Sequence, residues 1–171
     1  MFIKLNQKFN DISYLKGDVA LSYEGIISYF YIDELKADLL QIVPSKYKDA
    51  FSVSEMKITG AVPPHTDSNV KTVINFYVKP SNYRTVFFSG ESPSYQVLNQ
   101  TNGRVFYREN LTELDSFVAT EGDAFCLNVE QPHAVDALDA TPTERIAICL
   151  STNDYDFEQV CNMLCDTRYI H

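Results

Sequence analysis

Hydrophobic and polar residues follow one period before residue 51 and a different period after it. In the first part, Leu35, Leu39 and Ile42 recur at helical spacing before Pro44, so the pattern predicts a helix over 33–42. After residue 51 the chain consists of short strand-like runs separated by turn residues. These runs predict strands at 51–60, 72–79, 84–89, 95–98, 104–107, 115–119, 124–130 and 145–151.

An amphipathic segment near 154–165 predicts a C-terminal helix, and a mixed stretch at 23–31 leaves room for a further helical piece near the start. Helices that flank about eight short strands indicate an α+β fold whose β part is a jelly roll or a sandwich. The length of 171 residues suits one domain. We therefore expect a single domain over 1–171, with a helical N-terminal support at 1–50, a jelly-roll core at 51–152 and a C-terminal helix at 153–171.

The faces of two predicted strands suggest where a ligand would bind. In the strand that begins at residue 72, Val73, Asn75 and Tyr77 share one face, which suits a cavity, while the apolar residues between them suit a core. Arg145 opens the last predicted strand, and only small residues share its face. A long guanidinium beside small neighbours leaves room for a small anion, so Arg145 is a candidate for binding a carboxylate.

Three residues outside those runs are candidate metal ligands. His65 and Asp67 lie two positions apart, so on an extended segment both side chains project to the same side. The chain has one other internal histidine, His133, which follows Pro132. Two imidazoles and one carboxylate on one side of a metal, with the other positions open, are the ligand set of non-haem Fe(II) oxygenases. The set also suits Mn(II) or Co(II) better than a structural zinc ion, which four ligands would enclose.

The open positions of such a site extend the prediction to a co-substrate. They could hold a bidentate 2-oxo acid together with dioxygen, and Arg145 would then pair with the distal carboxylate of the acid. Tyr77, with Asn75 near it, is a candidate for a hydrogen bond to the same molecule. We expect no catalytic residue beyond the metal ligands.

Net charge and composition narrow the class of partner. The formal net charge of −9 argues against a nucleic-acid backbone as the partner, because phosphate binding requires a basic surface. No apolar run approaches the length of a membrane span, and the first residues lack the long apolar core of a signal peptide. We expect a cytoplasmic protein that binds neither nucleic acid nor a membrane, and the sequence leaves its oligomeric state open.

Five short motifs follow one another between residues 51 and 152. They are Pro64-His65-Thr66-Asp67, Thr72-Val73-Ile74-Asn75-Phe76-Tyr77-Val78, Gly122-Asp123-Ala124-Phe125, Pro132-His133-Ala134-Val135 and Arg145-Ile146-Ala147-Ile148. In this order and spacing the motifs resemble the Fe(II)/2-oxoglutarate-dependent oxygenase family, in particular its small stand-alone prolyl-hydroxylase-like members. The resemblance implies a double-stranded β-helix, with 2-oxoglutarate paired with Arg145 and with iron held by His65, Asp67 and His133.

The resemblance also implies an activity. In this family 2-oxoglutarate is converted to succinate and CO2 while a C–H bond of the substrate is hydroxylated. Family members that halogenate have a small residue in place of the acid, so Asp67 indicates a hydroxylase. The interval from His65 to His133 is compact, which argues against a large substrate cap. Loops that are rich in Tyr and Ser suit an amino acid, a peptide or another small polar substrate.

Two other classes of protein are compatible with the same residues. A cupin-like metalloenzyme that does not use 2-oxoglutarate would share the barrel and the three ligands, and Arg145 is the residue that separates it from a 2-oxoglutarate oxygenase. A non-catalytic jelly-roll binding module would need no metal. Against that class stands the cost of collecting two imidazoles and a carboxylate with no ion to satisfy them.

Overall fold

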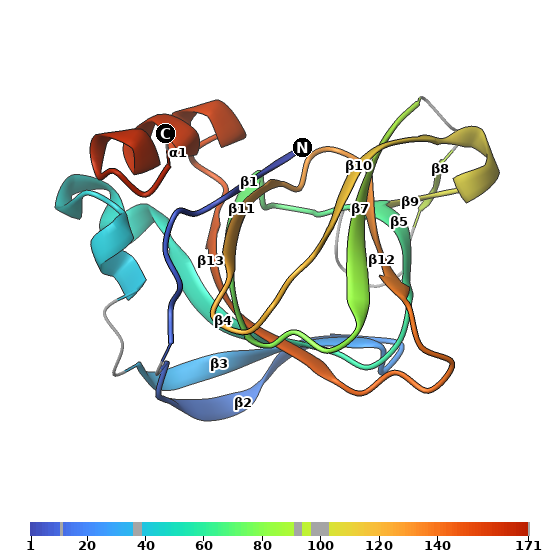
Figure 1. Cartoon of the computed structure of the whole chain (residues 1–171), viewed down its shortest axis with the longest axis horizontal. Helices are drawn as coiled ribbons and strands as arrows, with labels where there is room; N and C mark the ends of the chain where they lie inside the picture. Colours follow the sequence, from blue (N-terminus) through green and yellow to red (C-terminus); the bar gives the residue numbers. More distant parts are fainter. Residues whose placement is uncertain (11, 36–38, 91–93, 97–102, 171) are drawn as a thin grey trace.

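Two antiparallel sheets that face each other form most of the protein in the computed structural model, which describes residues 1–10, 12–35, 39–90, 94–96 and 103–170 (Figure 1). The larger sheet has seven strands in the order β1 (Phe2–Lys4), β11 (Ala124–Asn128), β6 (Thr72–Lys79), β13 (Arg145–Thr152), β4 (Ser52–Ile58), β3 (Ile27–Leu35) and β2 (Tyr14–Tyr23). The smaller sheet has six strands in the order β10 (Thr112–Val118), β7 (Tyr83–Ser89), β12 (His133–Ala137), β5 (Val62–Thr66), β9 (Arg104–Phe106) and β8 (Ser94–Gln96).

The chain passes between the two sheets in the manner of a jelly roll. From β4 to β7 successive strands alternate between the larger and the smaller sheet, and from β10 to β13 they alternate again. Within these two runs, strands that follow one another in sequence are therefore not neighbours in a sheet: β6 lies between β11 and β13, and β12 lies between β7 and β5. The predicted double-stranded β-helix is thus confirmed, and it brings together strands that are distant in sequence.

The helical N-terminal support that we expected over 1–50 is wrong. The structure has β2 and β3 there, added to the edge of the larger sheet, and two 3-10 helices, η1 (Leu39–Ile42) and η2 (Ser45–Ala50). The helix expected over 33–42 is replaced by the end of β3 and by η1, while residues 36–38 lie outside the described residues. In the described part of the chain the fold is therefore mostly β with one α-helix, and not α+β.

Strand propensity and pairing explain this difference. Residues 27–32 read Ile-Ser-Tyr-Phe-Tyr-Ile, and β-branched and aromatic side chains of this kind favour strands. β3 pairs with β4 on one side and with β2 on the other. The spacing that suggested a helix comes partly from Leu39 and Ile42, which are both buried because one 3-10 turn places residues three apart on the same face.

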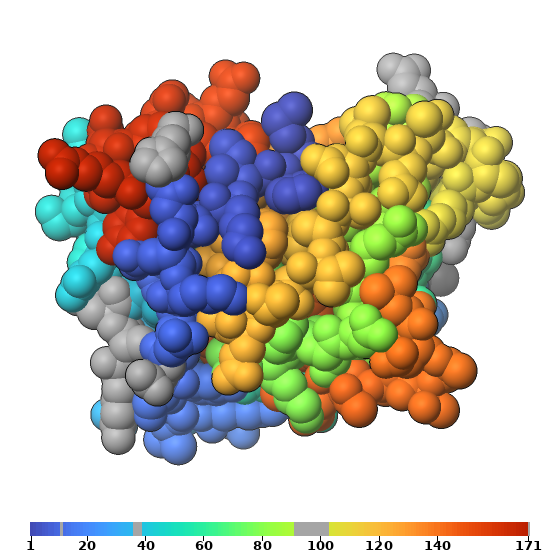
Figure 2. Space-filling view, in the orientation of Figure 1, coloured from blue at the N-terminus to red at the C-terminus, as the bar shows by residue number. Residues whose placement is uncertain are grey.

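The expected C-terminal helix is confirmed as α1 (Phe157–Asp166). A capping box begins it, because the Asp156 side chain accepts a hydrogen bond from the Gln159 backbone and the Gln159 side chain accepts one from the Asp156 backbone. In Figure 2 the N-terminal residues lie beside the C-terminal residues. The Asn6 N–H donates to the carbonyl of Tyr169, which follows the helix, at 2.8 Å. The core beneath α1 and η1 includes Leu39, Ile42, Ile74, Phe76, Val160 and Leu164.

The two faces of the larger sheet belong to different parts of the core. Ile74 and Phe76 on β6 pack beneath α1, whereas Tyr77 on the same strand faces the smaller sheet. On β13, Ile148 packs with the first group and Cys149 with the second. The alternation expected for these strands is therefore confirmed, and the inner faces of the two sheets enclose the candidate site. None of the helices in the described ranges is long and apolar enough to cross a membrane.

Candidate metal centre

The two internal histidines lie on adjacent strands of the smaller sheet. β5 and β12 pair antiparallel, and His65 and His133 are direct partners in their register. Neither strand was predicted, because Pro63 and Pro64 make β5 resemble a loop and β12 is only five residues long. The pairing places the centroids of the two imidazole rings 4.3 Å apart, with 50° between the ring planes.

Backbone carbonyls orient both imidazole rings in the same way. His65 Nδ1 lies 2.8 Å from the carbonyl oxygen of Pro63, and His133 Nδ1 lies 3.0 Å from that of Gln131. Because a carbonyl can only accept, each Nδ1 carries the proton and donates it. Nε2 of each ring is then free to bind a metal ion, with the ring already held in place by the hydrogen bond on its other nitrogen.

Asp67 directly follows β5 and turns its carboxylate toward both rings. Its backbone N–H donates to the carbonyl of Val129 at 3.0 Å, which holds the residue beside the end of β11. Asp67 Oδ1 lies 3.4 Å from His65 Nε2 and 3.8 Å from His133 Nε2. One ligand atom from each of the three residues lies within 4.8 Å of the others. The structure therefore brings together the three residues predicted as metal ligands.

The charges of these three side chains influence one another. Burial lowers the pKa of His65, but the hydrogen bond to Asp67 and its charge outweigh burial, so the pKa of His65 is raised. Burial raises the pKa of Asp67, but the hydrogen bond from His65 and the charge of His133 lower it overall. Burial and the charge of His65 lower the pKa of His133 to about 4. The site therefore favours one positive charge beside the carboxylate of Asp67. A metal cation bound there would supply that positive charge.

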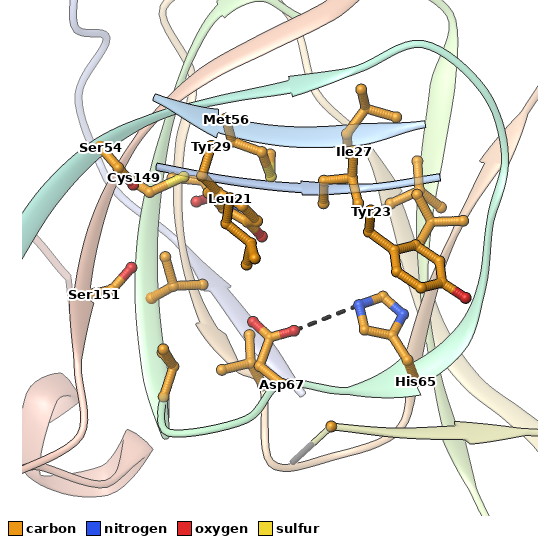
Figure 3. Close-up of a pocket in the computed structure, with 18 of the residues that line it drawn as sticks. Leu21, Tyr23, Ile27, Tyr29, Ser54, Met56, His65, Asp67, Cys149 and Ser151 are labelled. Atoms are coloured by element: carbon orange, nitrogen blue, oxygen red, sulfur yellow. Dashed lines mark ion pairs between the residues drawn. The ribbon is translucent and has the colours of Figure 1, made fainter. Parts of the chain in front are cut away.

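A cavity of about 410 Å³ lies between the two sheets, and the three candidate ligands line it. Arg145, Asn75 and Tyr77 line the same cavity. Figure 3 shows His65 and Asp67 on one side of it, joined by their ion pair, with side chains from β2, β3 and β4 opposite. Every residue that the sequence predicted for the site is therefore found in one cavity.

Arg145 is buried in this cavity, 1% exposed, with part of its guanidinium unpaired. Nη1 donates to Thr85 Oγ1 at 3.0 Å, and the guanidinium carbon lies 4.5 Å from the centre of the Tyr77 ring. Nε and Nη2 have no hydrogen-bond partner among the described residues. A buried cation without an anionic partner is costly. The arrangement therefore suits an anionic ligand that reaches these two nitrogen atoms.

The other residues around this guanidinium differ in what they offer. Tyr77 presents the face of its ring, which attracts a cation. Asn75 Oδ1 is buried without a hydrogen-bond partner among the described residues. Thr85 was not singled out from the sequence, although it is the one polar side chain between Tyr83 and Phe87 on the inner face of β7. An isolated threonine on an otherwise aromatic strand face is the signal that could have identified it.

Neither the family models nor the curated proteins include a match to this chain. Solved structures match it at low sequence identity. A vicilin from hazelnut, Corylus avellana, is 16% identical with a TM-score of 0.43, over 80% of this chain and 31% of the vicilin. Bacillus subtilis oxalate decarboxylase, which has Mn(II) centres, is 11% identical with a TM-score of 0.44, over 81% of this chain and 28% of the decarboxylase. Fe(II)-HppE with the alternative substrate (S)-1-HPP is 13% identical with a TM-score of 0.43, over 85% of this chain and 58% of that protein. This chain thus spans only part of the length of each.

Proposed function

We propose that this protein is an Fe(II)- and 2-oxoglutarate-dependent dioxygenase that hydroxylates a C–H bond and releases succinate and CO2. The observation that carries the proposal is the partly unpaired, buried guanidinium of Arg145 in the same cavity as His65, Asp67 and His133. The triad supports metal binding, and the arginine supports a carboxylate co-substrate. A cavity that offers a metal site and an unpaired arginine suits an acid that binds the metal at one end and the arginine at the other.

The three ligand residues fit a divalent ion. Ligand atoms about 2.1 Å from a metal ion lie about 3 Å from one another, and the distances of 3.4 and 3.8 Å from the Asp67 carboxylate to the imidazoles are only slightly longer. Both Nε2 atoms would bind as neutral imidazoles, and Asp67 would supply one negative charge. When bound, iron(II) supplies the open coordination positions at which a 2-oxo acid and dioxygen react.

The distance between Arg145 and the metal ligands suits a 2-oxo acid that contacts both. In the register of β12 and β7, His133 pairs with Phe87 and Val135 pairs with Thr85. Thr85 therefore lies two residues along the strand from the level of the His133 imidazole, which corresponds to about 6–7 Å. A 2-oxo acid that binds the metal through its oxo group and adjacent carboxylate would extend its other carboxylate over this distance. That carboxylate would pair with Nε and Nη2 of Arg145 in a bidentate manner.

The direct test is titration of 2-oxoglutarate into the anaerobic Fe(II)-loaded protein, followed by the metal-to-ligand charge-transfer band in the visible spectrum. Two control acids separate the contributions that the two ends of 2-oxoglutarate make to binding. Pyruvate has the chelating group without the distal carboxylate, so we expect a band only at much higher concentration. Glutarate has both carboxylates without the oxo group, so we expect no band and competition with 2-oxoglutarate.

Oxygen is then admitted and the release of succinate is measured. Iron binding without a charge-transfer band or succinate would refute the use of 2-oxoglutarate and leave a cupin-like metalloenzyme as the better assignment. Failure to bind Fe(II), Mn(II) or Co(II) would refute the metal centre itself.

A further inference from the structure

The wall of the cavity opposite the metal ligands is built from β2, β3 and β4. Leu21 on β2 pairs with Tyr29 on β3, and Tyr29 pairs with Met56 on β4. These cross-strand neighbours form one row across the sheet, and all three side chains line the cavity. We call this row, Leu21–Tyr29–Met56, the apolar row. In Figure 3 the side chains of Leu21 and Tyr29 face the carboxylate of Asp67 across open space.

The rows on either side add few polar groups. On one side Ile27 pairs with Ile58, and both line the cavity. On the other side Tyr31 pairs with Ser54, which is a small hydroxyl. A molecule that contacts this wall would therefore meet hydrocarbon, aromatic rings and a few hydroxyl groups, with its reactive atom directed toward the metal ligands.

Charge gives an independent constraint on that molecule. Among the described residues that line the cavity, Asp67 is the only carboxylate, and Arg145 is the only lysine or arginine. Both have a role in the proposed function, Asp67 at the metal and Arg145 at the co-substrate. With both bound, the charges of the divalent ion and Arg145 are balanced by Asp67 and the two carboxylates of 2-oxoglutarate. Among the described residues of the cavity, no charged group is left over to pair with an ammonium or a carboxylate on a substrate.

We infer that the substrate is a small uncharged molecule with a mainly apolar surface, which binds against the apolar row. The inference rests on the proposed function, because the charge balance includes the metal and 2-oxoglutarate. It differs from the polar substrate, such as a free amino acid, that the loop composition suggested. A zwitterion would have to bury two unpaired charges in this cavity, and that cost is much larger than any gain from apolar contact.

The cavity volume supports a small substrate. The value of about 410 Å³ lies in the lower part of the range for small-molecule sites, and the co-substrate shares the same space. The remaining room suits a group the size of one aromatic ring. Leu21 is 40% exposed, so the apolar row extends to the cavity mouth, where a substrate would enter.

The test uses ligand-observed saturation-transfer NMR on the full chain loaded with redox-inert Zn(II) and 2-oxoglutarate. Three probes share one aromatic ring and differ in charge: benzyl alcohol is neutral, benzylamine is a cation and phenylacetate is an anion. We expect benzyl alcohol to bind and each charged probe to bind at least about tenfold more weakly. Leu21→Arg, which places a charge in the apolar row, should lower the binding affinity for benzyl alcohol by at least about tenfold. Leu15→Arg is the matched control, because Leu15 is an exposed leucine on the same strand that does not line the cavity.

The proposed function and the substrate class fail in different ways. The signals of 2-oxoglutarate are observed in the same sample, and their failure to respond to the protein would contradict the proposed function. If 2-oxoglutarate binds while benzylamine or phenylacetate binds as tightly as benzyl alcohol, the inferred substrate class is wrong. The same conclusion follows if benzyl alcohol does not bind, or if Leu21→Arg and Leu15→Arg have equal effects.

Discussion

Replacement of Arg145 by methionine should have different effects on the free protein and on its complex with 2-oxoglutarate. The arginine is 1% exposed and donates one hydrogen bond, from Nη1 to Thr85 at 3.0 Å. The guanidinium also lies over the ring of Tyr77, and Nε and Nη2 have no hydrogen-bond partner among the described residues. In the free protein the guanidinium is therefore a desolvated charge with little compensation. In the complex it is the expected partner of a carboxylate.

The size of both effects follows from this environment. Replacement of buried charged groups by hydrophobic side chains of similar volume is often neutral or stabilising, so Arg145→Met should leave the free energy of unfolding without 2-oxoglutarate unchanged or increase it. Loss of a charge-assisted bidentate pair in a dry pocket costs about 2–5 kcal/mol. The affinity for 2-oxoglutarate should therefore fall by about 30-fold to several thousand-fold. Arg145→Lys should be intermediate, because the charge is kept while the planar fork is lost.

The assay combines urea unfolding of the metal-free proteins with anaerobic titration of 2-oxoglutarate into the Fe(II)-loaded proteins. Arg84→Met is the matched control. Arg84 precedes Thr85 on β7 but pairs with Glu113 and Asp136 at the surface, so its loss should leave the affinity for 2-oxoglutarate unchanged. If Arg145→Met binds 2-oxoglutarate as tightly as the wild type, the reasoning is refuted. If it is strongly destabilised without the co-substrate, the guanidinium is a structural element and not a binding group.

Other predictions concern the metal ligands and a buried carboxylate. His133→Ala should abolish divalent metal binding, whereas Asp67→Ala should retain weak metal binding through the imidazoles and lose hydroxylation. The metal content of each variant after dialysis checks both predictions. A normal metal stoichiometry in His133→Ala would refute the site. Chelation should lower the melting temperature of the metal-loaded wild type, because the ion binds only the folded state. Although burial raises the pKa of Asp123, hydrogen bonds from Lys4 and Lys8 outweigh it and hold the pKa well below its usual value. Asp123→Asn should therefore lower the free energy of unfolding by about 1–3 kcal/mol near neutral pH. This difference between wild type and variant should shrink as the pH falls below about 4, because the carboxylate takes up its proton in the unfolded chain before it does so in the folded protein. Urea unfolding near neutral pH and below about pH 4 measures the difference. A difference that stayed constant between these conditions would contradict the prediction.

The parts of the fold that could be predicted are those in which one interaction dominates the sequence pattern. β6 and β13 lie in the middle of the larger sheet, so each has two distinct buried faces, and alternation alone placed Tyr77 and Arg145 toward the cavity. Similarly, α1 has an amphipathic pattern and an Asp156 cap, which together specify a helix. In these segments the local preference and the tertiary environment agree.

The parts that could not be predicted depend on pairing partners that the local sequence does not reveal. No residue of β2 or β3 is fully buried, so these segments show no clear alternation, and they are strands because they extend the sheet beyond β4. β5 contains two prolines and pairs with β12 at only a few positions. His65 could therefore be recognised from its spacing to Asp67, while the strand that positions it could not. Thr85 stands out in the sequence as a threonine on an otherwise aromatic strand face, but its contact with Arg145 could not be predicted, because the two residues meet only in the folded chain.

The position of β2 and β3 has a consequence for how specificity is encoded. The candidate metal ligands lie on β5, directly after it and on β12, whereas the opposite wall comes from β2, β3 and β4, which precede both histidines in sequence. That wall is firmly attached, because Glu55 on β4 accepts a hydrogen bond from Tyr14 at 2.6 Å and pairs with Lys16 at 2.9 Å, both from β2. These contacts lie on the face of the sheet away from the cavity. We therefore predict that changes at Leu21 on the cavity side would alter the fit of a substrate without disturbing the candidate metal ligands or the attachment of the wall. If the proposed function holds, the surface that would bind the substrate and the candidate metal centre are separable in sequence, although they face each other across one cavity.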